Sequence, residues 1–473
     1  MLDERLRRGL VGVVGAAHVL DDPDVTASYE VDWTGRFRGK AAAVVRPGST
    51  EEVAGVLSLL HEAGRPVVLQ GGNTGLVGGG IPHHGELVLS LTRLRDVGPV
   101  DPLTAQVTVG AGTSLAGVHE VAAGAGLAFG VDLAARDSAT AGGMVATNAG
   151  GLRVLRYGDM RANVVGIEVV LAGGAVLSHL SGLTKDNTGY HLPGLFAGSE
   201  GTLGVVTRAR LRLVPRLDAR ATGLVAFAGV EPAMEALAEL RRRLSGCLEA
   251  AEMFFACGVT LVCDHLGIPP PFATLHPVYL LVEVAAATDP TEELATAVLE
   301  GVGDRALDGA VESDPAGRAR LWRYREAHTE AVNAAGVHAP GQDAAGGSPR
   351  ASWPIKLDVS LPGPALAEFV PRVQEAVAGV APQARCVLFG HAGDGNLHVN
   401  VLGALLADGH RVEDCVLQLV AGFGGSISAE HGIGVAKRAW LHLNRSPAEI
   451  AAFRAVKFAL DPKGILNPDV LLP

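Results

Sequence analysis

The chain has 473 residues, which at roughly 150 residues per domain is enough for two or three domains. Hydrophobic residues make up 48% of it and charged residues 19%, and this balance excludes an intrinsically disordered chain. The formal net charge is -11 and the longest basic cluster is Arg241–Arg243, which argues against nucleic acid as a partner.

The cysteines and the N-terminal segment bear on the compartment. Five cysteines without a C-x-x-C pair argue against a disulfide framework and favour a reducing compartment. The apolar stretch Leu10–Leu20 contains His18 and is too short to span a bilayer. Asp3 and Glu4 do not suit the basic start of a signal peptide. We therefore expect a cytoplasmic protein without a transmembrane segment.

The first half of the chain alternates between strand and helix patterns. Ala41–Arg46 predicts a strand, and Ser49 is expected to cap the helix that follows. Glu52 would complete a capping box, and Gly64 would end the helix. A strand at 66–69 then gives a βαβ unit. Further Val-rich strands are expected at 86–90, 106–110, 164–172 and 203–214.

The pattern changes near Pro215. The elements expected beyond it are a helix at 231–243, a strand at 279–284, a helix at 292–299, a Gly/Pro/Ala-rich loop at 334–354 and strands near 385–401. This order is typical of an α+β domain with an antiparallel sheet. We expect an α+β fold with two domains, the first at 1–215 and the second at 216–455, followed by a tail at 456–473.

A glycine-dense loop follows the strand at 66–69. Its glycines are Gly71, Gly72, Gly75, Gly78, Gly79 and Gly80. Glycine leaves room for a ligand at the main chain, so successive amides can converge on an anion, with the hydroxyl of Thr74 beside them. The spacing fits neither the Rossmann nor the P-loop pattern. The alternative is a glycine-rich turn that binds nothing.

Two later segments have a similar composition. Residues 137–151 combine the hydroxyls of Ser138 and Thr140 with paired glycines, and Asn148 could hydrogen-bond a polar heterocycle. The paired glycines are Gly142, Gly143, Gly150 and Gly151. Residues 186–204 form a third loop before a strand. Three such loops are more than a compact fold needs for its turns, which favours a bound pyrophosphate.

A histidine-rich hairpin is expected near residue 395. If Asp394–Gly395 are the two turn residues, His391 and His398 become cross-strand partners about 5 Å apart at their Cβ atoms, with Asn400 on the same face. The alternative is a hydrogen-bonded pair of surface histidines. Glu430 could add a third ligand, giving a His₂Glu metal site with open positions that suits zinc or manganese. The neighbouring His431 would then serve proton transfer.

Three further residues could bind carboxylates. Arg325 and Thr329 are four residues apart on an expected helix, hence on one face, and a guanidinium binds a carboxylate with two hydrogen bonds. The alternative is a solvated helix arginine. Lys356 is one of only six lysines and lies in a strand-like stretch.

The three glycine loops resemble the flavin-binding domain of the vanillyl-alcohol oxidase / p-cresol methylhydroxylase superfamily, and more narrowly its D-2-hydroxy acid dehydrogenase branch. The resemblance implies that 1–215 is a bipartite FAD-binding domain. It implies FAD contacts at Gly71, Gly72, Asn73, Thr74, Gly75, Leu76, Ser138, Thr140, Gly142, Gly143, Asn148, Gly150, Gly151, Glu200, Val205, Val206 and, in the tail, Asn467. Asn73 stands where covalent members usually carry histidine, so non-covalent FAD is expected.

The second half resembles the substrate (cap) domain of the same branch. The resemblance implies that His391, His398 and Glu430 bind a divalent metal and that His431 is the general base. It also implies that Arg325, Thr329 and Lys356 bind substrate, and Asn400, on the same face as the two histidines, is a further candidate. The expected reaction is oxidation of a D-2-hydroxy acid to the 2-oxo acid, with hydride transfer to flavin N5.

The choice of substrate follows from counting cations. D-2-hydroxyglutarate has a second carboxylate, which the Arg325 and Lys356 pair would neutralise, so it is favoured over D-lactate and glycolate. The interval between Thr329 and Lys356 is longer than is usual for the family, which affects the register of Lys356. A metal hydrolase and a non-catalytic flavin subunit are the alternatives of another class. The electron acceptor is left open between an electron-transfer flavoprotein and the quinone pool, as is a homodimer.

Overall fold

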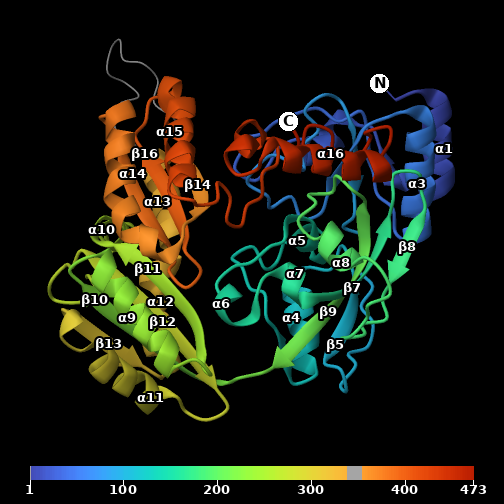
Figure 1. The fold of residues 1–473 in the computed structure, drawn as a ribbon. Helices are drawn as coiled ribbons and strands as arrows, with labels where there is room; N and C mark the ends of the chain where they lie inside the picture. The colour runs from blue at the N-terminus through green and yellow to red at the C-terminus, as the bar shows by residue number, and fades with distance from the viewer. Residues whose placement is uncertain (1, 338–353) are drawn as a thin grey trace. The chain divides into compact units, whose positions relative to one another are not determined.

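The computed structural model describes residues 2–337 and 354–473, which divide into two compact units (Figure 1). The first unit comprises Met1–Arg216 together with Glu430–Pro473, and the second comprises Leu217–Ala429. The expected second domain ran from 216 to 455, whereas the structure assigns residues 430–455 to the first unit. Part of the expected loop at 334–354 is helical, up to Val337, and 338–353 lie outside the described residues.

The first unit opens with a small sheet in the order β1-β2-β4-β3. Its elements are α1 (Glu4–Val14), β1 (Val19–Leu20), α2 (Pro23–Thr26), β2 (Val44–Val45), α3 (Thr50–Ala63), β3 (Val67–Gln70) and β4 (Leu87–Ser90). Ser49 caps α3 as predicted, and its side chain accepts a hydrogen bond from the amide of Glu52. The carboxylate of Glu52 accepts a hydrogen bond from the amide of Gly48. In a capping box it would accept the amide of Ser49, so the predicted capping box is only half formed. β2, α3 and β3 are a parallel crossover unit, but β4 lies between the two strands.

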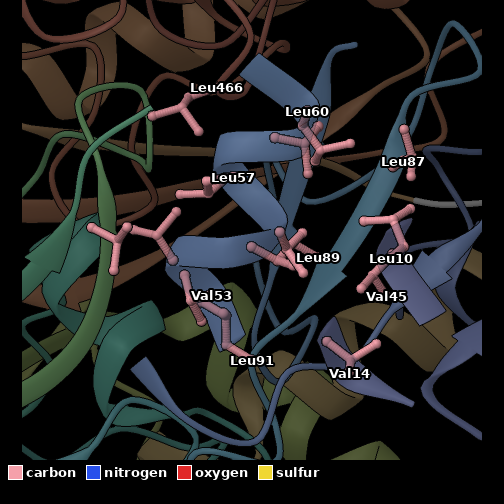
Figure 2. Packing of buried hydrophobic residues seen from close by; sticks show 14 of the residues in the cluster. Leu10, Val14, Val45, Val53, Leu57, Leu60, Leu87, Leu89, Leu91 and Leu466 are labelled. Atoms are coloured by element: carbon pink, nitrogen blue, oxygen red, sulfur yellow. The ribbon is translucent and has the colours of Figure 1, made fainter. Parts of the chain in front are cut away.

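A buried apolar cluster joins this sheet to its helices (Figure 2). Leu57 and Leu60 of α3 are fully buried and meet Leu87 and Leu89 of β4, because residues three apart on a helix and two apart on a strand share a face. Leu10 extends the cluster to α1. This packing fixes the end of β3, from which the first glycine loop begins.

A second sheet in the first unit has the order β5-β9-β7-β8, with β6 also paired to β9. Its elements are β5 (Gln106–Gly110), α4 (Leu115–Gly124), β6 (Leu127–Phe129), α5 (Ala141–Thr147), α6 (Val154–Tyr157), α7 (Met160–Asn163), β7 (Val164–Val170), β8 (Val176–His179), α8 (Leu192–Phe196) and β9 (Val205–Pro215). All of its strand pairs are antiparallel. Together with β4 of the first sheet, β5, β7 and β9 account for the strands predicted between residues 86 and 214.

The C-terminal part of the chain returns to the first unit. It contains the 3-10 helix η7 (Arg438–Leu443) and α16 (Pro447–Leu460), which begins with a capping box between Ser446 and Glu449. Beyond α16, Leu466 pairs with Val67 of β3 in a parallel bridge. The tail is thus held beside the strand that leads into the first glycine loop.

The second unit is built on a seven-stranded antiparallel sheet in the order β13-β10-β12-β11-β15-β16-β14. Its strands are β10 (Ala219–Phe227), β11 (Leu248–Phe255), β12 (Val278–Ala286), β13 (Asp308–Glu312), β14 (Ile355–Ser360), β15 (Arg385–His391) and β16 (Asn396–Leu402). Its α-helices are α9 (Val230–Arg243), α10 (Ala256–Leu266), α11 (Thr291–Thr296), α12 (Pro315–Glu326), α13 (His328–Val337), α14 (Leu366–Val380) and α15 (Gly409–Gly422). The antiparallel sheet expected for this half is confirmed.

Two helices of the second unit depart from the predicted pattern. The helix expected at 292–299 is α11 followed by a π-helical turn, Ala297–Val302. The helix expected to carry both Arg325 and Thr329 is interrupted at Ala327, so the two residues lie on α12 and α13. Among the described residues, no helix is long and apolar enough to cross a membrane.

Candidate functional site

The first two glycine loops of the first unit lie against each other at Gly71 and Gly72. A Cβ added to Gly72 would lie 1.7 Å from the carbonyl oxygen of Ser138, and one added to Gly71 would lie 2.3 Å from Oγ1 of Thr140. No side chain fits at either position, so the two loops can approach only because both residues are glycine. The sequence predicted both loops, and the structure brings them together.

The hydroxyl of Thr140 marks this junction as polar. Its Oγ1 is buried and has no hydrogen-bond partner among the described residues, which is costly unless a ligand or water satisfies it. Asn73 to Leu76 and Ser138 lie at least partly open to solvent nearby. A cradle of partly exposed glycine-loop residues with an unpaired buried hydroxyl fits the pyrophosphate of a dinucleotide.

The expected second loop is in part a helix. Residues 141–147 form α5, so Gly142 and Gly143 lie in its first turn rather than in a loop. A Cβ on Gly142 would lie 2.6 Å from the Cβ of Ala111, so this glycine lets α5 pack closely on the end of β5. Composition alone did not separate a glycine that serves packing from one that faces a ligand.

Residues 29–37 hold the first glycine loop in place. The sequence predicted the loop but not this support. Trp33 donates a hydrogen bond from Nε1 to the carbonyl oxygen of Thr74, at 3.1 Å. Asn73 has a positive φ of 53° and donates its amide to the carbonyl oxygen of Val31, at 2.9 Å. Since these partners are about 40 residues apart in sequence, no local pattern could reveal them.

The flavin-ring residues implied by the resemblance make mostly internal contacts. The amide of Asn148 donates to Asp159, and its oxygen accepts from the main chain of Arg161, at 2.7 and 2.8 Å. Gly151 donates its main-chain N–H to Oε1 of Glu430, at 2.8 Å. Glu430 is therefore held against the Gly150–Gly151 turn within the first unit.

The remaining residues implied for FAD lie in the third loop and the tail. Val205 and Val206 are buried in β9, and Glu200 is partly buried. Asn467 accepts from the amide of Leu69 and donates to the carbonyl oxygen of Glu200, both at 2.7 Å. The tail thus links the strand before the first glycine loop to the third loop.

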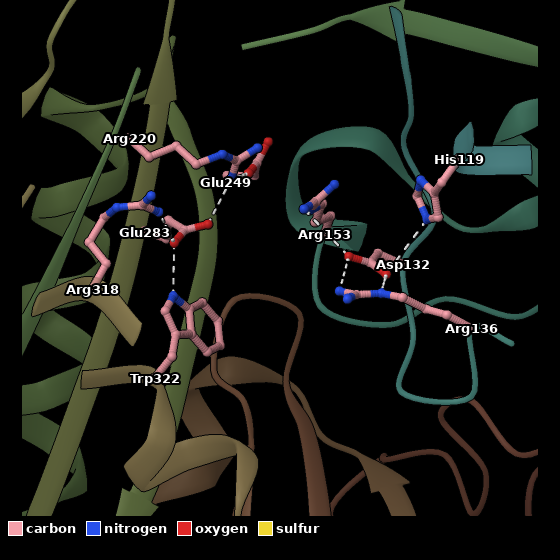
Figure 3. A network of polar contacts seen from close by, with 9 residues as sticks. All are labelled: His119, Asp132, Arg136, Arg153, Arg220, Glu249, Glu283, Arg318 and Trp322. Carbon is pink, nitrogen blue, oxygen red and sulfur yellow. Dashed lines mark hydrogen bonds and ion pairs between the residues drawn. The ribbon is translucent and has the colours of Figure 1, made fainter. Parts of the chain in front are cut away.

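Two ionic networks support these elements (Figure 3). In the first unit, Asp132 accepts two hydrogen bonds from Arg136 and faces Arg153, and its carbonyl oxygen accepts the amide of Leu152 beside Gly151. This network holds the turn that carries Gly151.

In the second unit, Glu283 of β12 accepts hydrogen bonds from Trp322 of α12 and from Arg220 of β10, at 2.8 and 2.7 Å. Arg318 of α12 lies 3.6 Å from the same carboxylate. Trp322 and Arg318 are four residues apart, so one face of α12 is fastened to the sheet. That helix also carries Arg325.

His391 and His398 share one face of the seven-stranded sheet, as predicted, but they are not direct partners. The observed register pairs His398 with Phe389, and residues 392–395 form a four-residue turn. The two-residue turn predicted at Asp394–Gly395 was wrong, because the amides of both residues bond the carbonyl oxygen of His391 and widen the loop. The imidazoles lie diagonally, with ring centroids 5.5 Å apart and planes at 82°.

Each imidazole faces a buried carboxylate through its Nδ1. For His391 the partner is Glu252 on β11, at 2.6 Å, and for His398 it is Asp358 on β14, at 3.4 Å. A carboxylate at Nδ1 fixes the orientation of a metal-binding imidazole and directs Nε2 to the ion. This donor set fits a divalent metal, and the sequence motifs predicted neither of the two carboxylates.

Glu252 also binds Arg325, so Arg325, Glu252 and His391 form one chain of contacting side chains. Nε of Arg325 donates to Oε2 of Glu252 at 2.6 Å, and the guanidinium lies 4.7 Å from the ring centre of Phe389. Burial alone would raise the pKa of Glu252, but His391 and Arg325 together lower it to about 2. The carboxylate therefore stays ionised at neutral pH.

The other residues expected to bind substrate differ in exposure. Lys356 pairs with Asn400 in the β14–β16 ladder, on the same face as His398, and burial lowers its pKa. No ion pair of Lys356 occurs among the residues that the structure describes. Asn400 is buried and donates to the carbonyl oxygen of Val387. Thr329 is exposed on α13, unlike the buried Arg325, so the two do not share an environment.

Comparison with known proteins defines the class. Residues 216–471 match the FAD linked oxidases, C-terminal domain, and residues 41–179 match an FAD binding domain. The chain belongs to the FAD-linked oxidases and is an FAD-dependent oxidoreductase. The metal hydrolase left open by the sequence is thereby set aside.

The relatives define a narrower group. A D-2-hydroxyglutarate dehydrogenase of Xanthomonas citri pv. viticola is 38% identical over 480 residues, covering 100% of this chain and 97% of that protein. The mitochondrial D-2-hydroxyglutarate dehydrogenase of Bos taurus is also 38% identical, over 96% of this chain and 81% of its own length. A Schizosaccharomyces pombe protein, provisionally named a D-lactate dehydrogenase, is 35% identical over 94% of this chain and 85% of its own. The resemblance drawn from the motifs is confirmed.

Solved structures share the fold. p-Cresol methylhydroxylase with substrate bound superposes with a TM-score of 0.75 at 16% identity, over 98% of this chain and 96% of that one. Alkyldihydroxyacetonephosphate synthase gives 0.74 at 17% identity, over 99% and 85%. The predicted fold class, with its bipartite FAD-binding domain and antiparallel sheet, is confirmed.

Proposed function

We propose that the protein oxidises D-2-hydroxyglutarate to 2-oxoglutarate, with the first unit holding FAD and the second unit binding the substrate. The observation that carries the substrate is Lys356, a half-buried cation on the same face of the sheet as His398 and without an ion-pair partner among the described residues. An unpaired buried charge is unfavourable, so a carboxylate is the expected ligand. The names of the curated relatives support the same substrate.

The cofactor assignments rest on the donor sets. FAD, when bound, accepts a hydride, and the contact of Gly72 with Ser138 together with the orphaned hydroxyl of Thr140 supports its pyrophosphate at that junction. Asn73 takes the position of a covalent anchor, and its amide is already bound to Val31, which supports non-covalent FAD.

A divalent metal, zinc or manganese, would be held by His391, His398 and Glu430 and would lower the pKa of the substrate hydroxyl. The carboxylates of Glu252 and Asp358 would orient the two imidazoles toward it. His431 would accept the hydroxyl proton at its ring nitrogen. Arg325 would position the Glu252 carboxylate as well as any substrate carboxylate.

Lys356→Met tests the substrate. It should lower kcat/KM for D-2-hydroxyglutarate by about 100-fold, as expected for a lost bond to a charged group, and that for D-lactate by much less. Lys185→Met is the matched control, since Lys185 is exposed in the first unit. Equal losses with both substrates would refute the assignment.

A monocarboxylate such as D-lactate or glycolate is the second candidate. It is favoured by the Arg325–Glu252 ion pair, because a guanidinium that is already neutralised offers less to a second substrate carboxylate. Anaerobic mixing with D- and L-2-hydroxy acids, followed by flavin absorbance, would decide between them. If no 2-hydroxy acid bleaches the flavin, the chain is a non-catalytic flavin subunit.

We also propose that reduced flavin passes its electrons to an electron-transfer flavoprotein or to the quinone pool. The same preparation, supplied with either acceptor, tests this by return of the flavin absorbance. Size-exclusion chromatography of the same preparation tests whether the protein is a homodimer.

A further inference from the structure

The segment 430–437 is held by all three glycine loops of the first unit. Glu430 accepts the amide of Gly151, which belongs to the second loop. The amides of Val435 and Ala436 donate to the carbonyl oxygen of Val77 in the first loop, at 2.9 and 3.2 Å. The third loop contributes the side chain of Glu200. The segment that carries His431 therefore takes its shape from the elements expected to bind FAD.

Glu200 accepts two main-chain amides of this segment. Its Oε1 accepts the amide of Ile433 at 2.8 Å and its Oε2 accepts the amide of Gly434 at 2.7 Å. Burial raises the pKa of Glu200, while the two amides and nearby Lys437 oppose that rise. Two adjacent main-chain amides on the two oxygens of one carboxylate hold the peptide between them in a fixed orientation.

Glu200 is itself firmly placed. Its own amide donates to the carbonyl oxygen of Ala146, and its carbonyl oxygen accepts from Asn467, both at 2.7 Å. Its φ is 51°, a conformation that a residue with a side chain adopts only when its surroundings impose it. A side chain on so constrained a backbone has few alternative positions.

The turn is closely fitted to Glu200. Gly432 and Gly434 have φ values of 80° and 53°, which favour glycine. A Cβ on Gly432 would lie 2.9 Å from Oε1 of Glu200, and one on Gly434 would lie 2.3 Å from the carbonyl oxygen of Val77. Both glycines are therefore explained by their close contact with the two loops.

We propose that Glu200 is a positioning residue, which fixes the turn at Gly432–Gly434 and thereby orients His431, rather than an FAD contact. This inference rests on the proposed role of His431. It predicts that loss of the carboxylate frees the turn while the pyrophosphate cradle, built from Gly72 and Ser138, stays intact.

Glu200→Gln tests the inference, because the amide nitrogen that replaces one carboxylate oxygen cannot accept a hydrogen bond, so Ile433 and Gly434 can no longer each bind an oxygen of their own. Hydrogen exchange of these two amides should accelerate by ~10-fold or more, since one charge-assisted bond is lost. Bound FAD should stay at one per chain, and kcat should fall by roughly 10- to 100-fold with KM changed by less than about threefold. Glu120→Gln, on the exposed face of α4, is the matched control.

Two outcomes would overturn the inference. Unchanged exchange at Ile433 and Gly434 would show that Glu200 does not hold the turn, and loss of FAD with normal exchange would make Glu200 a cofactor contact. Should Glu200→Gln fold poorly, Gly432→Ala approaches the same contact from the turn and should give the same exchange, FAD and kcat pattern. His431→Ala separates the two proposals: retained turnover refutes the base, while the exchange result in Glu200→Gln still tests the turn.

Discussion

His328 is a buried histidine whose ring has no hydrogen-bond partner among the described residues. It is fully buried at the start of α13, with ring centroids 5.4 Å from Phe254 and 4.8 Å from Phe389. Neither Nδ1 nor Nε2 forms a hydrogen bond, although the carbonyl oxygens of Tyr324 and Arg325 lie near enough to favour protonation slightly. Burial, and then the positive charge of Arg325, lower its pKa to about 3. His398 is the other titratable group that contributes to this shift.

This shift makes stability depend on pH in a defined window. Below the ordinary pKa of 6.5 the unfolded chain binds a proton at His328 while the folded chain does not, so stability falls as the pH falls from 6.5 toward 3. The loss is about 1.4 kcal/mol per pH unit, hence about 2.7 kcal/mol at pH 4.5. His328→Phe removes this cost and also two unsatisfied buried nitrogens, worth roughly 1–3 kcal/mol at any pH.

Urea unfolding at several pH values between 7.5 and 4.5 measures the difference. The stability gained by His328→Phe over the unchanged protein should grow by about 2 to 3 kcal/mol across this range. His410→Phe, an exposed histidine of the same unit, should show no such growth. A gain that is independent of pH would mean that His328 is protonated in the folded state, or solvated, and would refute the reasoning.

Two further predictions concern the cofactor cradle and the buried ionic chain. Gly72→Ala should purify with little or no flavin, because its Cβ would lie 1.7 Å from the Ser138 carbonyl oxygen, whereas Gly124→Ala, with open space around it, should keep its flavin absorbance. Glu252→Gln leaves Arg325 as an uncompensated buried charge, so urea unfolding should report a loss of about 3–5 kcal/mol. A loss below 1 kcal/mol would mean that water or substrate groups already compensate Arg325.

Local signals in the sequence predicted the helices and strands, but not which of them pair or pack together. The cap at Ser49 and the stop at Gly64 are set by backbone chemistry within one turn, so the bounds of α3 could be read directly. The insertion of β4 between β2 and β3 depends on which strand edges meet, and no local pattern encodes that. The break at Ala327 was missed for a related reason, since tertiary packing of α12 and α13 overrides a continuous helical pattern.

In the candidate site, too, local features could be predicted from the sequence and contacts between distant residues could not. Strand periodicity correctly placed His391 and His398 on one face, because side chains alternate along a strand whatever the register. Register depends on the length of the turn, and there the prediction failed by two positions. Glu252 lies 139 residues before His391, and Trp33 lies 41 before Thr74, so only the folded chain could identify them.

The arrangement around the two imidazoles argues against a merely structural pair. The two rings have centroids 5.5 Å apart and planes at 82°, and each faces a different carboxylate through Nδ1. Burying Glu252 as an ion is costly, and Arg325 is needed to offset that cost. A fold that only needed to fill this space could do so with apolar side chains at lower cost. The two carboxylates fix the direction in which Nε2 of each ring points. A metal-binding imidazole needs such an orientation.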